Sequence, residues 1–153
     1  MKNPTIKLMA VSVFAAAVAS CSGCATPSQM YWDHKVKELC EKDGGVTVYE
    51  KIELTKDKKI QLKIAPSKKY ATSEYDYFYE SKEEIINEMN PSVKKYISYL
   101  YRNSDKKLIA VQIDYGRVGG DIPSGIGHDS SYNCDRAGVS TQITKSVFFI
   151  KGE

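Results

Sequence analysis

The sequence predicts an α+β fold, in which an antiparallel sheet of four to five strands carries one main helix on a face and is accompanied by a second, short helix. Two observations favour this class. One segment repeats its apolar residues with the period of a helix, and several later segments alternate apolar and polar residues as strands do. The 11 tyrosines of the chain fit the same fold, because tyrosine favours half-buried positions in sheets.

The main helix is expected to run from Ser28, a suitable N-cap, to the Gly44-Gly45 pair. Its apolar residues fall at i, i+4, i+7 and i+8 and form one stripe: Trp32, Val36, Leu39 and Cys40. This spacing predicts that Trp32 packs on the sheet, that Cys40 points inward from the last turn and that His34 lies on the exposed side.

Alternation over 46–54 and 60–64, around a turn at 55–58, predicts a β-hairpin over 46–64. Tyr75, Tyr77 and Tyr79 follow on one side of a short strand or aromatic loop. Such a row packs on its own sheet, or it stacks on a sugar or contacts a protein partner.

Ser81 and Glu84 have the spacing of a capping box, and they predict a second helix that ends at Asn90-Pro91. For 94–116 the apolar spacing fits both a helix over 94–102 and a hairpin. The strand-forming residues before a polar turn at 103–106 favour the hairpin. Residues 141–151 are expected to form the last strand.

The segment from Gly116 to Asp135 is rich in glycine and contains Pro123, so we expect a long loop. Such a loop is uncommon unless it is functional or held down. Cys134 lies in this loop and Cys40 at the end of the main helix. In an exported protein these two cysteines are expected to form a disulfide that joins the loop to the helix.

Residues 1–23 have the features of a lipoprotein signal peptide. Lys2 and Lys7 give a positive start, and the uncharged run from Leu8 to Ala19 is shorter than the about 20 apolar residues of a transmembrane helix. The chain then divides into the leader (1–23), a short tether (24–29) and a single α+β domain (30–153), which is one domain by size.

Two cysteines compete for the lipid, a palmitate-bearing anchor. Lipidation of Cys24 leaves Cys40 and Cys134 as an even pair, whereas lipidation of Cys21 leaves Cys24 as an unpaired thiol. We therefore favour Cys24, with Cys21 as the alternative. A third possibility is cleavage after Ala17-Val18-Ala19, which would release a soluble secreted protein.

Removal of the leader also changes the charge. The 22 Lys and Arg residues include Lys2 and Lys7, so the mature chain keeps 20 of them against 19 Asp and Glu residues. This balance argues against a nucleic-acid partner.

Candidate ligand contacts concentrate in the 117–131 loop, at Arg117, Asp121 and His128. Arg117 could clamp a carboxylate or phosphate, or it could simply pair with Asp121 across the loop. The sequence has no Gly-x-Ser-x-Gly motif and no histidine pair spaced for zinc. We therefore predict no enzyme activity, catalytic residue, cofactor or metal.

Three features together resemble a set of small bacterial lipoproteins of uncharacterised function. They are the lipobox at Cys21–Cys24, the block from Trp32 to Glu50, and Gly119–Pro123 followed by Ser130–Cys134. The resemblance implies a strand-turn-strand over 94–116 and no particular activity. Where those proteins carry a Pro and an aromatic residue in the loop, this chain has Ser124–His128.

These observations predict a lipid-anchored protein of the cell envelope that faces the periplasm and serves as a binding or structural module. The outer membrane is preferred, because the residue after the lipidated cysteine is not the aspartate of inner-membrane lipoproteins. The partner would be another envelope protein or the cell wall. The alternative is an envelope hydrolase or hydrolase inhibitor that uses the 117–131 loop.

Overall fold

The computed structural model describes residues 25–121 and 129–150. The predicted leader, with Cys21 and Cys24, lies outside the described residues. The elements in chain order are α2 (Pro27–Asp43), β1 (Gly45–Val48), β2 (Ile52–Leu54), α3 (Lys56–Gln61), β3 (Ile64–Ala65), the 3-10 turn η1 (Lys68–Tyr70), β4 (Tyr77–Asn87), β5 (Ser92–Arg102), β6 (Leu108–Val118), β7 (Ser131–Asn133), α4 (Ile143–Val147) and β8 (Phe148–Ile150).

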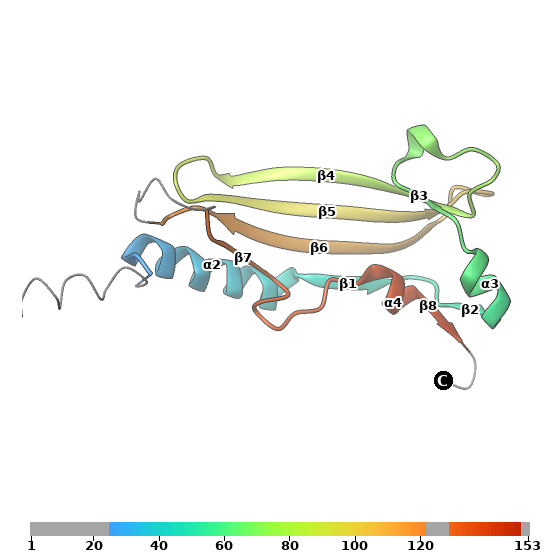
Figure 1. Ribbon diagram of the computed structural model, residues 1–153, viewed down its shortest axis with the longest axis horizontal. Helices are drawn as coiled ribbons and strands as arrows, with labels where there is room; N and C mark the ends of the chain where they lie inside the picture. The colour runs from blue at the N-terminus through green and yellow to red at the C-terminus, as the bar shows by residue number, and fades with distance from the viewer. Residues whose placement is uncertain (1–24, 122–128, 151–153) are drawn as a thin grey trace, which may run out of the picture.

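The fold is α+β, as predicted, and its sheet is built around three long neighbouring strands, β4, β5 and β6 (Figure 1). The strand order is β1-β6-β5-β4-β3. β1 pairs with residues 110–113 of β6, and β7 pairs with residues 116–118 of the same strand. The sheet has six strands and is mixed, because β3 pairs in parallel with β4. It is therefore larger than the antiparallel sheet of four to five strands that we expected.

The predicted hairpin over 94–116 is confirmed as the β5–β6 pair, with Ile97 opposite Ile113. Because successive residues of a strand point to opposite faces, Val93, Tyr99 and Tyr101 share one face of β5, whereas Tyr96 and Leu100 share the other. The two faces are covered by different parts of the chain.

Helix α2 packs on the first of these faces, but only over one half of it. Its buried residues Val36 and Cys40 form a cluster with Val93, Tyr115 and Cys134, against which Trp32 packs. The contact of Trp32 with the core confirms the predicted packing of the helix stripe. We call this region the helix-covered half, and the remainder of the same face, around Tyr99 and Tyr101, the open half.

The opposite face is covered at the other end of the sheet by the C-terminal elements. Leu100 and Ala110 form a second cluster there with Val147 of α4 and Phe148 of β8. Strand β8 pairs in parallel with β2 in a separate two-stranded sheet. No helix in the described part of the chain is long and apolar enough to cross a membrane.

The predicted hairpin over 46–64 is wrong. β1 pairs with β6 instead of with its neighbour in sequence, and residues 56–61 form α3, whose N-cap Thr55 accepts a hydrogen bond from the Lys58 amide at 3.3 Å. The alternation breaks at Glu50, which pairs with Arg102 and Lys107.

The predicted helix after Ser81 is also wrong, because these residues belong to strand β4. The Ser81 hydroxyl, expected as a helix cap, instead faces the Ser98 hydroxyl across the β4–β5 pair at 3.4 Å. The long pairing with β5 outweighs the local capping signal, as tertiary contacts often outweigh propensity. The short helices are α3 and α4 instead.

Three boundaries also differ. The main helix begins at Pro27 after the N-cap Thr26, earlier than the expected Ser28. The expected loop over 116–135 is shorter, because β6 extends to Val118 and β7 occupies 131–133. The expected last strand is divided into α4 and β8, and residue 151 lies outside the described residues.

Candidate functional site

The predicted ligand residue Arg117 lies inside the protein rather than on a ligand-binding surface. Only 2% of it is exposed. Its Nε donates to Asp33 of α2 at 2.5 Å, and its Nη1 donates to the Gly119 carbonyl and to the Ser130 hydroxyl. Our sequence interpretation offered Asp121 as the partner of Arg117. The ion pair instead forms with Asp33.

Asp121 is held by the same loop. One of its carboxylate oxygens accepts from the Ser130 amide at 2.6 Å, and the other accepts from Gln29 Nε2 at 3.1 Å. The hydrogen bond from the Ser130 backbone is the main cause that lowers the pKa of Asp121. His128 lies outside the described residues. The two predicted contacts that the structure places are thus used to fasten the loop to α2.

The first residues of α2 complete this network. Thr26 and Gln29 form a capping box, in which the Thr26 hydroxyl accepts from the Gln29 amide at 3.0 Å. The same hydroxyl donates to the Gly120 carbonyl at 2.5 Å, and the Gly120 amide donates to Asn90 Oδ1 at 2.6 Å. The start of the helix, the end of β6 and the β4–β5 turn are therefore tied together.

Glycine is required at Gly119 in this network. Its φ of +86° is disfavoured for other residues, and a Cβ at Gly119 would lie 2.5 Å from Asn90 Oδ1. Gly119 therefore allows the end of β6 to lie close to the β4–β5 turn.

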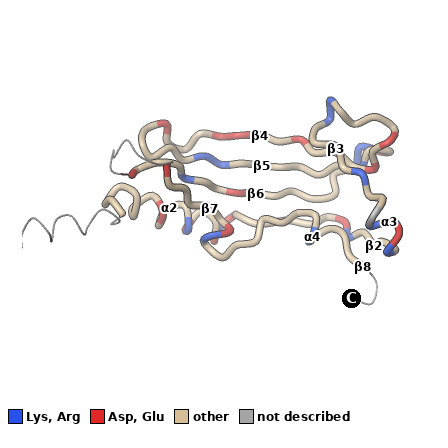
Figure 2. The backbone as a smooth tube through the Cα atoms, viewed as in Figure 1, with Lys and Arg blue, Asp and Glu red and all other residues tan. Residues whose placement is uncertain are grey.

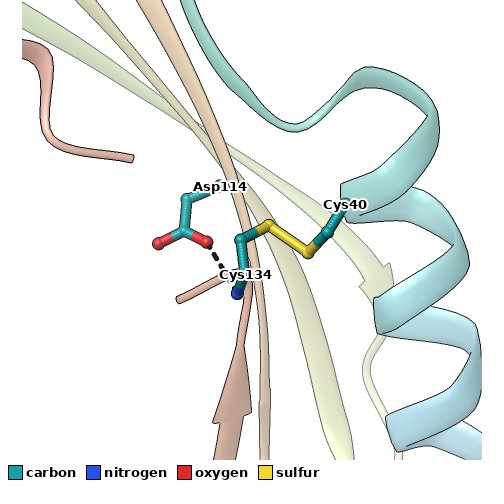
Figure 3. A group of neighbouring side chains, drawn as sticks. All are labelled: Cys40, Asp114 and Cys134. Atoms are coloured by element: carbon teal, nitrogen blue, oxygen red, sulfur yellow. Dashed lines mark hydrogen bonds between the residues drawn. A yellow bond between two sulfur atoms is a disulfide. The ribbon is translucent and has the colours of Figure 1, made fainter. Parts of the chain in front are cut away.

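The predicted disulfide joins Cys40 of α2 to Cys134, with Sγ atoms 2.10 Å apart (Figure 3). Asp114 lies beside it, and its carboxylate accepts from the Cys134 amide at 3.2 Å. Burial raises the pKa of Asp114. The two sulfurs and this carboxylate lie within 4.8 Å of one another, but bonded sulfurs carry no thiolate to bind a metal. We therefore assign the cluster a structural role.

Tyr77 and Tyr79 of the predicted tyrosine row pack on their own sheet, one of the two alternatives from the sequence, whereas Tyr75 precedes β4. Tyr77 is buried in the C-terminal cluster, where its ring meets that of Phe148 edge to face at 5.0 Å. Tyr79 packs against the same cluster. Their hydroxyl pKa values are raised chiefly by burial. Tyr77 and Tyr79 are thus used in the packing of the protein's own core.

A different set of aromatic rings lies in the open half. Tyr101 stacks on Phe78 of β4 with ring centroids 5.3 Å apart, and Tyr99 lies next to Tyr101 at 6.4 Å. Lys106 Nζ lies over the Phe78 ring at 5.3 Å from its centroid. Helix α2 does not reach these rings, since it ends at Asp43 beside Lys95 and Tyr115. Phe78 is buried, and Tyr99 and Tyr101 are half-buried.

The open half continues into a groove of about 460 Å³ between η1 and the strands β4 and β5. We call it the tyrosine groove. It is lined by two tyrosines of the open half, a third tyrosine from β4, three lysines, a glutamate and two serines: Ser67, Lys68, Lys69, Tyr79, Glu80, Ser81, Lys82, Tyr99 and Tyr101. Lys68 Nζ lies 3.5 Å from Glu80 Oε1 and Lys82 Nζ lies 2.7 Å from Glu84 Oε1. The groove therefore combines flat aromatic surface with a small excess of positive charge.

The groove runs along an edge of the sheet. β3 pairs with β4 only through Tyr77 and Phe78, so residues 79–87 of β4 have no second strand beside them among the described residues. An unpaired edge presents free backbone groups to another extended chain. Charged residues along this edge, visible in Figure 2, oppose pairing between two copies of the same strand.

A larger cavity, of about 650 Å³, lies at the turn between β5 and β6. Its polar side chains already have protein partners. Asn103 Nδ2 donates to the carbonyls of Thr72 and Tyr75 at 2.8 and 2.9 Å, and Arg102 pairs with Asp105 and Glu50. This cavity is less suited to recognition than the groove, because its polar groups would have to leave these partners.

Our sequence interpretation missed Tyr99 and Tyr101, which it used only as evidence for a strand. Two features of the sequence could have indicated them. Alternation along the correctly predicted strand places both tyrosines on the face of Val93, where the helix was expected, and the helix is shorter than the strands. A helix of 17 residues spans about 26 Å, whereas β4, β5 and β6 each have 11 residues and span about 37 Å. One helix that begins at one end of the sheet therefore leaves part of the face uncovered.

Comparison with known proteins gives no family assignment. No protein-family model, curated protein or solved structure matches the chain.

Proposed function

We propose that the protein is a lipid-anchored binding module of the cell envelope, and that its tyrosine groove holds an extended segment of another envelope protein. The observation that carries this proposal is the groove itself, where the half-buried rings of Tyr99 and Tyr101 lie next to an unpaired strand edge. An extended segment would gain backbone hydrogen bonds from the edge of β4 and side-chain contacts from Tyr99 and Tyr101.

The charges of the groove indicate what the segment carries. Three lysines line it against one glutamate, so acidic side chains interspersed with apolar ones complement it best. Tyrosine supports such contacts because its rigid ring offers a large apolar area with a polar tip.

Export and lipidation rest on the sequence of the leader. The fold supports this placement, because the Cys40–Cys134 disulfide requires an oxidising compartment in most proteins. The alternative of a hydrolase or hydrolase inhibitor was based on Arg117, Asp121 and His128 as ligand contacts. Arg117 and Asp121 are engaged within the loop network, and His128 lies outside the described residues.

Affinity capture from chemically cross-linked envelopes tests the binding proposal. The variants Tyr99→Ala and Lys82→Glu should each lose the captured partner. Two matched controls should keep it. Tyr96→Ala removes a tyrosine from the opposite face of β5, and Lys94→Glu breaks an ion pair of the same 2.7 Å length as that of Lys82.

The result that would contradict binding at the groove is capture that is equal for the groove variants and their controls. Recovery of peptidoglycan fragments instead of a protein would assign the groove to the cell wall and overturn the protein partner.

Palmitate labelling tests the anchor separately. Cys24→Ala should lose the label and its membrane fractionation, whereas Cys21→Ala should keep both. If neither substitution changes fractionation into membranes, the protein is not anchored in this way.

A further inference from the structure

We infer that the end of the domain where α2 begins lies in the lipid interface of the membrane, so that the protein docks end-on instead of swinging on a flexible tether. This inference rests on the proposed lipid anchor. It concerns the anchor end, which we define as the first turn of α2, the β4–β5 turn and the last residues of β4 and β6.

The first argument is the place where the chain enters the domain. Thr26 is fixed to Gly120, and Gly120 to Asn90 in the β4–β5 turn. Cys24 precedes Thr26 by two residues, which span at most about 7 Å. Instead of the expected tether over 24–29, the helix starts at Pro27. A lipid on Cys24 therefore enters the membrane beside the anchor end.

The second argument is the exposed apolar surface at that end. Of the ten exposed large apolar residues that the described chain carries, six lie there: Met30, Tyr31, Ile85, Ile86, Met89 and Val118. Met89, in the turn itself, has the greatest exposure, 74%. Figure 1 shows the start of α2, the β4–β5 turn and the end of β6 at the same end of the molecule. Exposed apolar residues gathered in this way are typical of interaction sites.

The charges favour an apolar over an electrostatic attraction. Glu88 is exposed in the turn beside Met89, where Figure 2 shows an acidic segment. The basic side chain nearest the turn along β5, Lys94, is paired with Glu83 at 2.7 Å. Docking should therefore not require anionic lipid, and it should depend little on salt.

A fluorescent label tests this arrangement in the full lipidated protein, reconstituted in phosphatidylcholine vesicles. Met89→Cys places an environment-sensitive dye at the anchor end, and Tyr70→Cys, with 56% exposure, places it at the other end of the sheet. With Cys40 and Cys134 paired, the introduced cysteine is the intended labelling site. The unsubstituted protein, treated in the same way, measures any labelling of Cys24.

The label at position 89 should shift its emission to shorter wavelength and be quenched several-fold more than the label at position 70 by nitroxide lipids. A second variant, Ile86→Asp in the position-89 background, should reduce the quenching. If the protein floats with the vesicles but both labels report water, the inference fails while the anchor stands. If the protein does not float, the proposed anchor fails, and the inference fails with it.

Discussion

The two halves of one sheet face differ in how their residues are used. In the helix-covered half, charged and polar side chains form ion pairs and hydrogen bonds within the protein, and Arg117 is buried against Asp33. In the open half, two tyrosines lie next to a groove and an unpaired strand edge. The comparison teaches that residue types typical of binding sites do not locate a site by themselves. The candidate site lies instead on the part of the sheet face that helix α2 does not reach.

Removal of the disulfide that joins the helix-covered half should give the largest loss of stability. The Cys40–Cys134 disulfide closes a loop with a sequence separation of 94, for which chain entropy predicts a loss of about 4–5 kcal/mol in the free energy of unfolding. Urea unfolding of the double variant Cys40→Ala/Cys134→Ala measures it. Hydrogen exchange should rise most in α2 and β7 and least in the β4–β5 pair. An equal rise in all strands would contradict a separate stabilisation of the helix-covered half.

Two arginines compare a buried ion pair with a partly exposed one. Arg117→Ala leaves the Asp33 carboxylate and a buried carbonyl without their partner, and we expect a loss of about 3 kcal/mol. Arg102, on the opposite face of the sheet, pairs with two carboxylates, but its side chain is 26% exposed, so Arg102→Ala should cost about 1 kcal/mol or less. Thermal unfolding of both variants checks the difference. Similar losses would show that burial of Arg117 does not increase the stability lost on its removal.

A smaller contrast is expected at the helix caps. Thr26 caps α2 with both bonds of a capping box and also bonds Gly120, whereas Thr55 caps the short α3 with one bond. Thr26→Ala should cost about 1–2 kcal/mol, and Thr55→Ala less than about 1 kcal/mol. Denaturant titration of the two variants measures the contrast, and the reverse order would contradict the role of Thr26 in fixing the anchor end.

The smallest effects concern two aspartates around the helix-covered half. Burial alone would raise the pKa of Asp43, but hydrogen bonds from Lys95 and Tyr115 outweigh it and lower that pKa. Its contribution to stability is therefore present at neutral pH and lost as the pH falls through the folded-state pKa. Burial raises the pKa of Asp114, so its ionised form costs stability once the pH rises above the pKa of the unfolded state.

Asp43→Asn should therefore destabilise the protein at pH 7, and Asp114→Asn should stabilise it. Each change should be at most about 1 kcal/mol, because both carboxylates are partly solvated, and both should diminish as the pH falls through the folded-state pKa values. Unfolding measured across this pH range tests the signs. Two changes of the same sign at pH 7 would contradict the assignment of opposite pKa shifts.

The sequence predicted the elements that depend on contacts between residues close in sequence better than those that depend on contacts between distant segments. The main helix, the β5–β6 hairpin and the disulfide follow from period, turn residues and cysteine parity, and all three are present. The segment after Ser81 was predicted as a helix from a local cap, yet it forms β4 because of its long pairing with β5. The pairing of β1 with β6 joins residues more than 60 positions apart, and no local signal encodes it.

The candidate site was predicted less well for a related reason. Arg117, Asp121 and the glycines were recognised as chemically capable residues, but their partners Asp33, Gln29 and Asn90 come from distant segments. Tyr99 and Tyr101 were placed on a strand correctly. Their exposure depends on where α2 ends over the sheet, which only the assembled fold defines.

Site-specific photo-cross-linking in intact cells tests the central claim most directly. A photoreactive phenylalanine analogue replaces Tyr99 in the open half and, as the matched control, Tyr96 on the opposite face of the same strand. We predict a discrete adduct with one envelope protein from position 99 and none from position 96. No adduct from position 99, or the same adduct from both positions, would contradict a binding module that uses the tyrosine groove.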